Sequence, residues 1–487
     1  MKHLLILSLF ATAAYTPSFA QSKPAANPAA AADGYEIKVT LKPLKNEYIY
    51  LGHYYGKQLP IVDSVKLNAQ GEGVFKGSKK LGGGIYLVGF PDRSRNFEIL
   101  VDKNQRFSVV ADTAQMENIQ FTGSPENVAF LDYQKAMGRS GRAIDALMRQ
   151  RSGSAPADSV RLSGEIQKLQ KDVQQYRTDI MTKDPNGILA TLLKAMREPE
   201  VPQNHPDAAR DSLFGYKYYK AHYWDGVNFW DERLVRTPFF EPRLDKYFAQ
   251  LVYPVADSVK KELDWMLGYA SINEEMQKFL LLKFANRYLN QQYMWEDAVF
   301  VHLFEKYFSN KTYPWLTDQG KKVITDRAYS LMANLTGNPA SDIELPGLDG
   351  KQKSLYGIKS PYTLVTIWDP TCGHCKEVVP RIDSLHAAKW KAQGVALFGM
   401  AKESEGTRET WTSFIKEHKL NDWTHVYYSR ASEKARVDAG TPSYSQLYDV
   451  QSFPTLYLLD KDKRIIAKKL TEQQVDEILE HRRKGGK

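Results

Sequence analysis

The alternation of apolar and polar residues changes twice along the 487-residue chain. From Tyr35 to about Gly123, short runs such as YEIKVTL alternate apolar with polar residues, and turn sequences such as GEG, GGG and DKNQ separate them. A period of two residues with this punctuation is typical of β-strands. The pattern predicts a small β-rich accessory domain over residues 34–124, an antiparallel sandwich or barrel.

From about Pro125 the apolar period becomes that of a helix. The segment RLSGEIQKLQKDVQQYRTDI places apolar residues at alternating steps of four and three. These residues lie on one face of a long amphipathic helix: Leu162, Ile166, Leu169, Val173, Tyr176 and Ile180. Similar patterns follow at GILATLLKAM, DSVKKELDWMLGYA, NEEMQKFLLLKFANRYLN and DAVFVHLFEKYF. The sequence therefore predicts an α-helical accessory domain over residues 125–337.

Aromatic residues crowd the segment YKYYKAHYWDGVNFWDE between Tyr216 and Glu232. One interpretation is a surface that grips an unfolded or peptide substrate. The other, which we favour, is packing between helices, because large aromatics dominate ordinary cores. Three histidines of the predicted helical domain, His205, His222 and His302, have no second His or Cys at ligand spacing. We interpret them as surface or core histidines rather than metal ligands.

The third pattern alternates strands with helices. It begins after LTGNPASDIELPGLDGKQKSL with the apolar, β-branched run YTLVTIWD. The strand-like VALFGMA and WTHVYYS, the helical TRETWTSFIKEH, the hairpin-like FPTLYLLDKDKRIIAKKL and a closing helix EQQVDEILEH follow. This order predicts an α/β domain over residues 338–487.

The N-terminus has the features of a targeting segment. Lys2, an apolar run and the small-residue end Ser18-Phe19-Ala20 predict a signal peptide over residues 1–20, followed by a low-complexity linker over residues 21–33. No later run is long and apolar enough to span a bilayer, so we expect a soluble periplasmic protein. The formal charge of +9 is spread along the chain, and with export it argues against a nucleic-acid partner.

The chain has only two cysteines, Cys372 and Cys375, and they stand two residues apart. A disulfide between them closes a loop too small to stabilise much, so we expect chemistry. At the start of a helix, free N–H groups and the helix dipole are expected to favour the Cys372 thiolate. Cys375, one turn inside, is shielded and can attack a mixed disulfide formed through Cys372. His374 between them can stabilise the thiolate further.

Other interpretations of the pair are a zinc site, a haem attachment and a structural disulfide. A structural zinc site takes about four ligands, and the sequence has no second Cys-x-x-Cys. Covalent haem attachment needs a histidine directly after the second cysteine, where this chain has Lys376. A purely structural disulfide gains little from so short a loop. We therefore favour redox chemistry and expect no metal and no cofactor.

These residues resemble a known family. Trp368 followed by Cys-Gly-His-Cys-Lys, Pro380 in the helix, and Phe453-Pro454-Thr455 at a late strand resemble the exported TlpA/ResA-like thiol-disulfide oxidoreductases of the thioredoxin superfamily. The resemblance covers the chain from about Asn338 to the C-terminus. It implies a thioredoxin-like fold for this region.

The resemblance also implies roles. Cys372 is expected to be the nucleophile and Cys375 the resolving thiol, together forming the redox-active disulfide, while Gly373 and His374 tune its potential. Substrate binding is expected from three residues: Trp368, Phe453 and Pro454. Pro454 matches the cis-proline of the family, which leaves the backbone of Phe453 open for pairing with an extended substrate.

The sequence departs from the family at two positions. Many relatives carry a buried acid six residues before the first cysteine, and this chain has Thr366 there. Asp369 and Glu377 are nearby in sequence and could act through water, although Asp369 at a strand end is also typical of a turn or cap. No general base is assigned. Thr371 stands where many relatives have tryptophan, which widens access to the sulfur.

The upstream segments resemble accessory domains. DSVKLNAQGEGVFKG, GIYLVGF and FTGSPEN are similar to a β-rich domain of unknown function found before such thioredoxin modules, and the helical middle resembles a companion domain. The leading hypothesis is a periplasmic reductase or isomerase whose partners are disulfide-containing exported proteins and a membrane thiol-disulfide reductant. The alternative is an envelope ligand-binding or redox-sensor protein that uses the thioredoxin module as a scaffold or switch.

Overall fold

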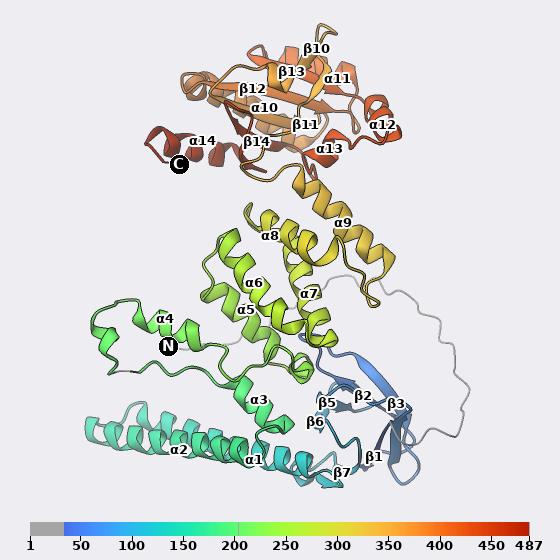
Figure 1. The fold of residues 1–487 in the computed structure, drawn as a ribbon, viewed down its shortest axis with the longest axis vertical. Coiled ribbons are helices and arrows are strands. Elements are labelled where there is room, and N and C mark those ends of the chain that lie inside the picture. Colours follow the sequence, from blue (N-terminus) through green and yellow to red (C-terminus); the bar gives the residue numbers. More distant parts are fainter. Residues whose placement is uncertain (1–33, 203, 487) are drawn as a thin grey trace. The chain divides into compact units, whose positions relative to one another are not determined.

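The computed structural model describes residues 34–202 and 204–486, so the predicted signal peptide and linker lie outside the described residues. The chain forms two compact units, which divide between Ala190 and Thr191 (Figure 1). The fold class expected from the sequence, β-sheets followed by a helical region and an α/β domain, is confirmed. The bounds predicted for the signal peptide, the linker and the three domains stay predictions.

Two four-stranded sheets form the β-rich part of the first unit, in the orders β4-β1-β7-β8 and β3-β2-β5-β6. The strand bounds are β1 Tyr35–Lys42, β2 Tyr48–His53, β3 Ile61–Lys66, β4 Glu72–Gly77, β5 Gly84–Gly89, β6 Asn96–Val101, β7 Arg106–Asp112 and β8 Gln120–Thr122. Inward residues of both sheets, such as Ile37 and Ile99, share one core. The pairing is antiparallel except between β1 and β7, which are parallel.

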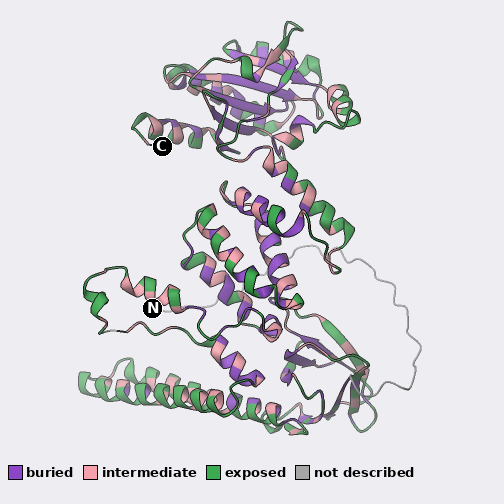
Figure 2. Ribbon diagram, viewed as in Figure 1, coloured by how far each residue is buried: buried purple, intermediate pink, exposed green. Residues whose placement is uncertain are grey.

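A long helical hairpin, α1 (Pro125–Arg151) and α2 (Pro156–Lys183), completes the described first unit. The predicted stripe on α2 is confirmed, because Leu162 and Ile166 are buried and its other apolar members are half-buried. Asn127 fixes α1 to the sheet: its fully buried amide accepts from Leu100 N (2.7 Å) and donates to Leu100 O (2.8 Å). Most other α1 and α2 positions are exposed or half-buried (Figure 2).

The helical region of the second unit packs short helices around aromatic and aliphatic residues. Its helices are α4 Phe214–His222, α5 Phe240–Gln250, α6 Ala256–Ala270, α7 Glu274–Leu289, α8 Glu296–Leu303 and α9 Asp318–Met332, after α3 Ile188–Met196 at the division. A π-helical turn, Phe304–Phe308, continues α8. Within the aromatic segment Tyr223, Trp224 and Phe229 are buried, as packing requires, whereas Tyr216 and Trp230 stay exposed.

A five-stranded sheet in the order β13-β12-β11-β14-β15 forms the centre of the C-terminal α/β domain. β11, β12 and β13 are parallel to one another. β14 is antiparallel to β11, and β15 is antiparallel to β14. The strands are β11 Tyr362–Trp368, β12 Val395–Lys402, β13 Trp423–Tyr428, β14 Thr455–Asp460 and β15 Ile465–Lys468, and a small hairpin precedes them, β9 Glu344–Pro346 and β10 Gln352–Ser354. The helices are α10 Gly373–Leu385, α11 Arg408–Glu417, α12 Arg430–Asp438, α13 Tyr444–Leu447 and α14 Glu472–Arg483.

Apolar side chains cover both faces of this sheet. On one face, Leu364 and Trp368 of β11 pack with α10, α11 and α14, in a cluster that includes Cys375. On the other face, Val365 and Ile367 pack with the tyrosines of β13, α13 and β14. β11 is therefore buried from Thr363 to its end, and the sheet is the most deeply buried part of the domain (Figure 2). This burial gives the loop after β11 a rigid base.

Candidate functional site

The two cysteines lie where a buried strand passes into a helix. β11 ends at Trp368 and α10 begins at Gly373, with Cys372 as its N-cap residue. The backbone N–H of Lys376 donates to the Cys372 carbonyl (3.1 Å), which closes the first helical turn. Both cysteines are free thiols; Cys372 is half-buried and Cys375 is fully buried. The predicted placement of the pair at a helix N-terminus is confirmed.

A second segment, far along the chain, meets the Cys372 sulfur. The Cys372 thiol donates to the carbonyl oxygen of Phe453, with an Sγ–O distance of 3.8 Å, and the two residues are 81 positions apart. The bond between Phe453 and Pro454 is cis, as the resemblance implies. Both residues are half-buried and precede β14. The fold thus brings three of the predicted site residues together at one sulfur.

Cys375 is chemically unlike Cys372 because it lies on the face of α10 that packs against β11 and is buried there. Burial raises the pKa of the Cys375 thiol far above its usual value, and the neighbouring Cys372 and the negative charge of Asp369 raise it further, against a backbone hydrogen bond with Asp369 that lowers it. The Cys375 thiol therefore keeps its proton at neutral pH. This supports a thiol held in reserve until its neighbour has reacted.

Asp369 organises the loop that leads to Cys372. Its Oδ1 accepts from the Thr371 backbone N–H (2.7 Å) and hydroxyl (2.6 Å), and its backbone oxygen accepts from Cys372 N (3.2 Å). Its Oδ2 accepts from Glu405 N (3.3 Å). Burial alone would raise the pKa of the Asp369 carboxyl, but these hydrogen bonds from Thr371 and Glu405 outweigh it and lower that pKa. The turn interpretation of Asp369 is confirmed.

Sequence reasoning missed the loop that packs against this turn, residues 403–407. A Cβ atom at Gly406 would lie 2.9 Å from Pro370 Cγ and 3.0 Å from Thr371 Cγ2, so only glycine permits this close approach. Glu405, its neighbour, donates the backbone hydrogen bond to Asp369. A single glycine more than thirty residues downstream gives no pattern that links it to the cysteines. The contact depends on β12 lying beside β11.

Thr366 and Trp368 share the β11 face on which Cys375 packs. The Thr366 side chain is fully buried, and among the described residues its hydroxyl has no hydrogen-bond partner. No carboxylate therefore enters the core at this position. Trp368 is also fully buried, and its ring packs against Phe414 at 5.1 Å between centroids. It offers a substrate no exposed surface in this structure, so its expected part in substrate binding stays a prediction.

The remaining residues of the motif are near the surface. Gly373, His374 and Glu377 are exposed, and Pro380 lies inside α10. Within residues 34–202 and 204–486, the His, Cys, Asp and Glu side chains form no group of three or more that could hold a metal ion. In the same ranges no helix is long and apolar enough to cross a membrane. The roles assigned to Gly373 and His374 stay predictions.

Fold and site together define a thioredoxin-like domain with a Cys-x-x-Cys pair at the start of its first long helix. Comparison with known families agrees: residues 336–468 match the AhpC/TSA family. The upstream region matches two domains of unknown function, DUF4369 over residues 35–130 and DUF5106 over residues 163–334. The resemblance of both accessory segments to such domains is confirmed.

Curated relatives are thiol-disulfide oxidoreductases. The chain is 25% identical over 142 residues to the thiol-disulfide oxidoreductase ResA of Bacillus cereus, which is 29% of this chain and 73% of that protein. It is 24% identical over 148 residues to ResA of Bacillus thuringiensis subsp. konkukian, 30% of this chain and 77% of that protein. The predicted resemblance to ResA-like thiol-disulfide oxidoreductases is therefore confirmed, and general thiol-disulfide exchange is the activity that these relatives support.

Solved structures similar to this chain include a thioredoxin-like protein from Bacteroides caccae, at 21% identity and a TM-score of 0.42, covering 58% of this chain and 97% of that one. The thioredoxin domain of a thiol-disulfide oxidoreductase from Bacteroides vulgatus is 27% identical, with a TM-score of 0.26, and covers 30% of this chain and 95% of that one.

Proposed function

We propose that this protein is a periplasmic thiol-disulfide oxidoreductase that uses Cys372 and Cys375 to reduce or isomerise disulfides of other exported proteins. The observation that carries the proposal is the unequal pair of free thiols. Cys372 is half-buried at a helix N-terminus and lies 3.8 Å from the Phe453 carbonyl, whereas Cys375 is fully buried behind it. Attack needs an accessible sulfur, and resolution needs a second thiol shielded behind it.

The reaction proceeds in two exchanges. The Cys372 thiolate attacks one sulfur of the substrate disulfide; a bond from Cys372 to that sulfur forms, the substrate disulfide breaks, and its second sulfur leaves as a thiolate. Cys375 then attacks the Cys372 sulfur, and the first substrate sulfur leaves. The enzyme pair is oxidised to a disulfide, the substrate gains two electrons, and the protons given up by Cys372 and Cys375 end on the two substrate thiols.

The Phe453 carbonyl gives the substrate a place to pair. It lies beside the reactive sulfur at the start of β14, and carbonyl groups at a strand end accept hydrogen bonds from an extended peptide. A substrate backbone bound there would bring its disulfide to Cys372. Phe453 and Pro454 are both half-buried and so retain surface for this contact.

The location and partners are part of the proposal. The N-terminal signal pattern supports export, and disulfides persist in exported proteins. Each reductive cycle leaves the pair oxidised, so a dithiol donor must return two electrons; a membrane thiol-disulfide reductant is the partner that an exported enzyme requires. The dithiol state described here is the form that such a donor regenerates.

Purified full-length protein tests this proposal. Wild type should reduce a dye-labelled peptide disulfide in the presence of dithiothreitol, and Cys372→Ser should have no activity above the uncatalysed rate. After the dithiothreitol is removed, reduced Cys375→Ser should accumulate a mixed disulfide with the peptide. Circular dichroism should show that all three proteins are folded. Equal rates for wild type and Cys372→Ser would overturn the proposal and favour the binding or sensor alternative.

A further inference from the structure

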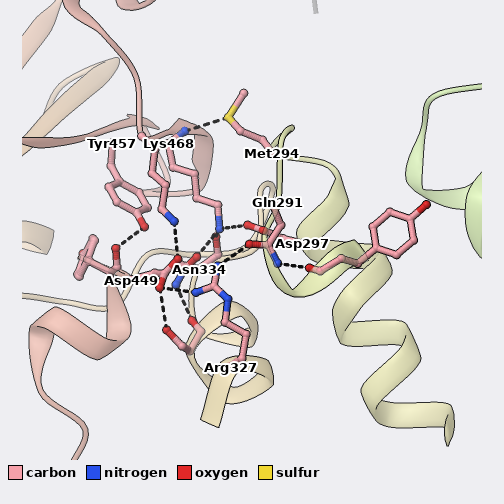
Figure 3. Close-up of polar contacts among 12 residues, drawn as sticks. Gln291, Met294, Asp297, Arg327, Asn334, Asp449, Tyr457 and Lys468 are labelled. Carbon is pink, nitrogen blue, oxygen red and sulfur yellow. Dashed lines mark hydrogen bonds and ion pairs between the residues drawn. The ribbon is translucent and has the colours of Figure 1, made fainter. Parts of the chain in front are cut away.

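A polar junction joins the helical region to the thioredoxin-like domain inside the second unit (Figure 3). Three residues on one side of α9 and its end contact the segment just before Phe453. Arg327 Nη1 binds Asp449 Oδ1 (2.5 Å), Ser330 Oγ donates to Gln446 O (3.0 Å), and Asn334 Nδ2 donates to Leu447 O (3.0 Å). Steps of three and four residues place them along one helix face. That face donates hydrogen bonds to two backbone oxygens of the 446–454 segment and forms an ion pair with one of its carboxylates.

Asp449 is the centre of this contact. It is 5% exposed, and its backbone has a φ of +43°, in the left-handed region that few non-glycine residues adopt. Lys469 Nζ binds Asp449 Oδ2 at 2.5 Å, opposite Arg327. Burial raises the pKa of the Asp449 carboxyl, but the charges and hydrogen bonds of Lys469 and Arg327 outweigh it and lower that pKa. A backbone of this kind persists where surrounding contacts hold it.

Further buried polar contacts join and support the two sides of the junction. The Lys468 ammonium, only 2% exposed, binds Asp297 of α8 and donates to the backbone oxygen (2.8 Å) and side-chain oxygen of Asn334. Arg327 in turn donates to the Gln291 side chain and to Leu289 O (3.3 Å). Arg327 is therefore held within the helical region before it reaches Asp449, and Lys468 extends from β15 of the thioredoxin-like domain to partners in the helical region (Figure 3).

Asp449 of the junction lies four residues before Phe453, whose carbonyl accepts a hydrogen bond from the Cys372 thiol at 3.8 Å. The far end of the segment is fixed by its own sheet: Thr455 Oγ1 donates to Ser452 O (2.6 Å), and Lys469 N donates to Leu456 O (2.7 Å). The segment that presents the Phe453 carbonyl is therefore held on one side by β14 and β15 and on the other side by α9.

We propose that Arg327 and Ser330 are positioning residues for substrate binding: the helical region matched by DUF5106 sets the place of the Phe453 carbonyl through Asp449 and Gln446. This rests on the proposed function, since it assigns the substrate backbone to the Phe453 carbonyl. It gives the helical region a definite part in the reaction. The contacts described for Arg327 and Ser330 are with the 446–454 segment and the helical region, not with the cysteines.

Kinetics on two substrates test the proposal in full-length protein. The peptide disulfide pairs its backbone with the 446–454 segment, whereas 5,5′-dithiobis(2-nitrobenzoate) has no peptide backbone and needs only the Cys372 sulfur. Arg327→Gln should raise KM for the peptide about tenfold, which is about 1.4 kcal/mol. Its kcat and its rate with the small reagent should stay within about twofold of wild type, because the chemistry of the pair is unchanged. Ser330→Ala should shift KM in the same direction by less.

Lys322→Gln is the matched control. Lys322 lies on the same helix and pairs with Asp326 at 2.6 Å, but both side chains are exposed and Lys322 makes no junction contact. It should behave like wild type on both substrates. Unchanged peptide KM in both Arg327→Gln and Ser330→Ala would overturn the proposal, and so would an equal loss on both substrates, because that loss is structural and not specific to backbone pairing.

A second measurement separates this proposal from the activity. Hydrogen exchange of the amides in residues 447–456 should be faster in Arg327→Gln than in Lys322→Gln, because the segment loses its ion pair with α9. If wild type reduces no peptide disulfide, the proposed function fails, and exchange still decides whether α9 holds the segment. Equal exchange in the two variants would overturn that hold.

Discussion

Two loops meet at the cysteine pair, and they are held in different ways. The first, residues 369–372, is fixed inside the thioredoxin-like domain by hydrogen bonds from Thr371 and Glu405 to the Asp369 carboxylate. The Cys372 N–H donates to the Asp369 backbone oxygen. The second, the 446–454 segment, is fixed partly from α9 through Arg327, and the buried pair of Lys468 and Asp297 joins the same two regions. The reactive sulfur depends on local structure, whereas the carbonyl beside it depends on another region.

This difference indicates which region of the molecule governs the thiol chemistry and which governs substrate placement in the proposed activity. The chemistry of Cys372 and Cys375 is self-contained, because every contact of the first loop comes from within the domain. Substrate placement depends on charged groups that are buried, and a buried ion pair is costly to break from one side only. Changes in the helical region should therefore alter binding before they alter chemistry.

Lys468→Met should produce the largest loss of stability, because it leaves Asp297, which is 4% exposed, without its cation. Breaking a buried pair from one side costs about 3–5 kcal/mol in the free energy of unfolding. Urea unfolding followed by tryptophan fluorescence measures it, and Lys468→Met/Asp297→Leu should recover most of the loss. Lys434→Met, which breaks an exposed pair with Asp438, is the control and should have little effect. Wild-type stability in Lys468→Met would show that the buried ion pair between the two regions contributes nothing to stability.

Asp369→Ala should come next, because it removes the acceptor for the Thr371 and Glu405 hydrogen bonds in the first loop. Hydrogen bonds to a buried charged group suggest a loss of about 2–3 kcal/mol in the free energy of unfolding. Urea unfolding provides the value. Asp349→Ala, which removes a carboxylate that closes an exposed turn with Lys351, should cost less. If both variants lose equally, burial of Asp369 adds nothing to the first loop.

Acid should lower the free energy of unfolding, because each of the two loops is held by a carboxylate that must stay ionised. The pKa values of Asp369 and Asp449 are lowered in the folded protein, so the unfolded chain binds more protons in the acid range. The free energy of unfolding therefore falls as pH drops below the usual Asp pKa of about 3.9 and on through the folded values. Urea midpoints at pH 7 and pH 3 should differ less in Asp449→Asn and in Asp369→Asn than in wild type. Asp257→Asn, at a highly exposed residue, should keep the wild-type difference.

Thr366→Val should have the smallest effect and the opposite sign. The variant has the same shape and removes a buried hydroxyl without a partner among the described residues, so stability should rise by about 0.5–1 kcal/mol. Thr363→Val on the same strand is the contrast, because the Thr363 hydroxyl accepts from Lys463 Nζ (3.1 Å) and its loss should destabilise. Peptide reduction by Thr366→Val should match wild type. A clear loss of activity would place Thr366 in the proton route of Cys375.

Much of the fold could be predicted from periodicity. The stripe from Leu162 to Ile180 and the run ending at Trp368 have the residue spacing of a helix and a buried strand, and the structure has both. The parallel pairing of β1 and β7 was outside the prediction, because a period of two residues identifies strands but not their neighbours. Thr366 could be located but not its buried, unpartnered state.

By itself the sequence determined the chemistry of the pair. Cys372 and Cys375, two residues apart at a strand-to-helix passage, place one sulfur at the helix N-terminus and the other one turn inside, and this follows from local geometry. Only the tertiary structure decided what surrounds them: Gly406 against the first loop, Phe453 against the sulfur, and Arg327 on Asp449, 122 positions away. Contacts of that separation depend on strand order and side-chain packing, which no local pattern specifies.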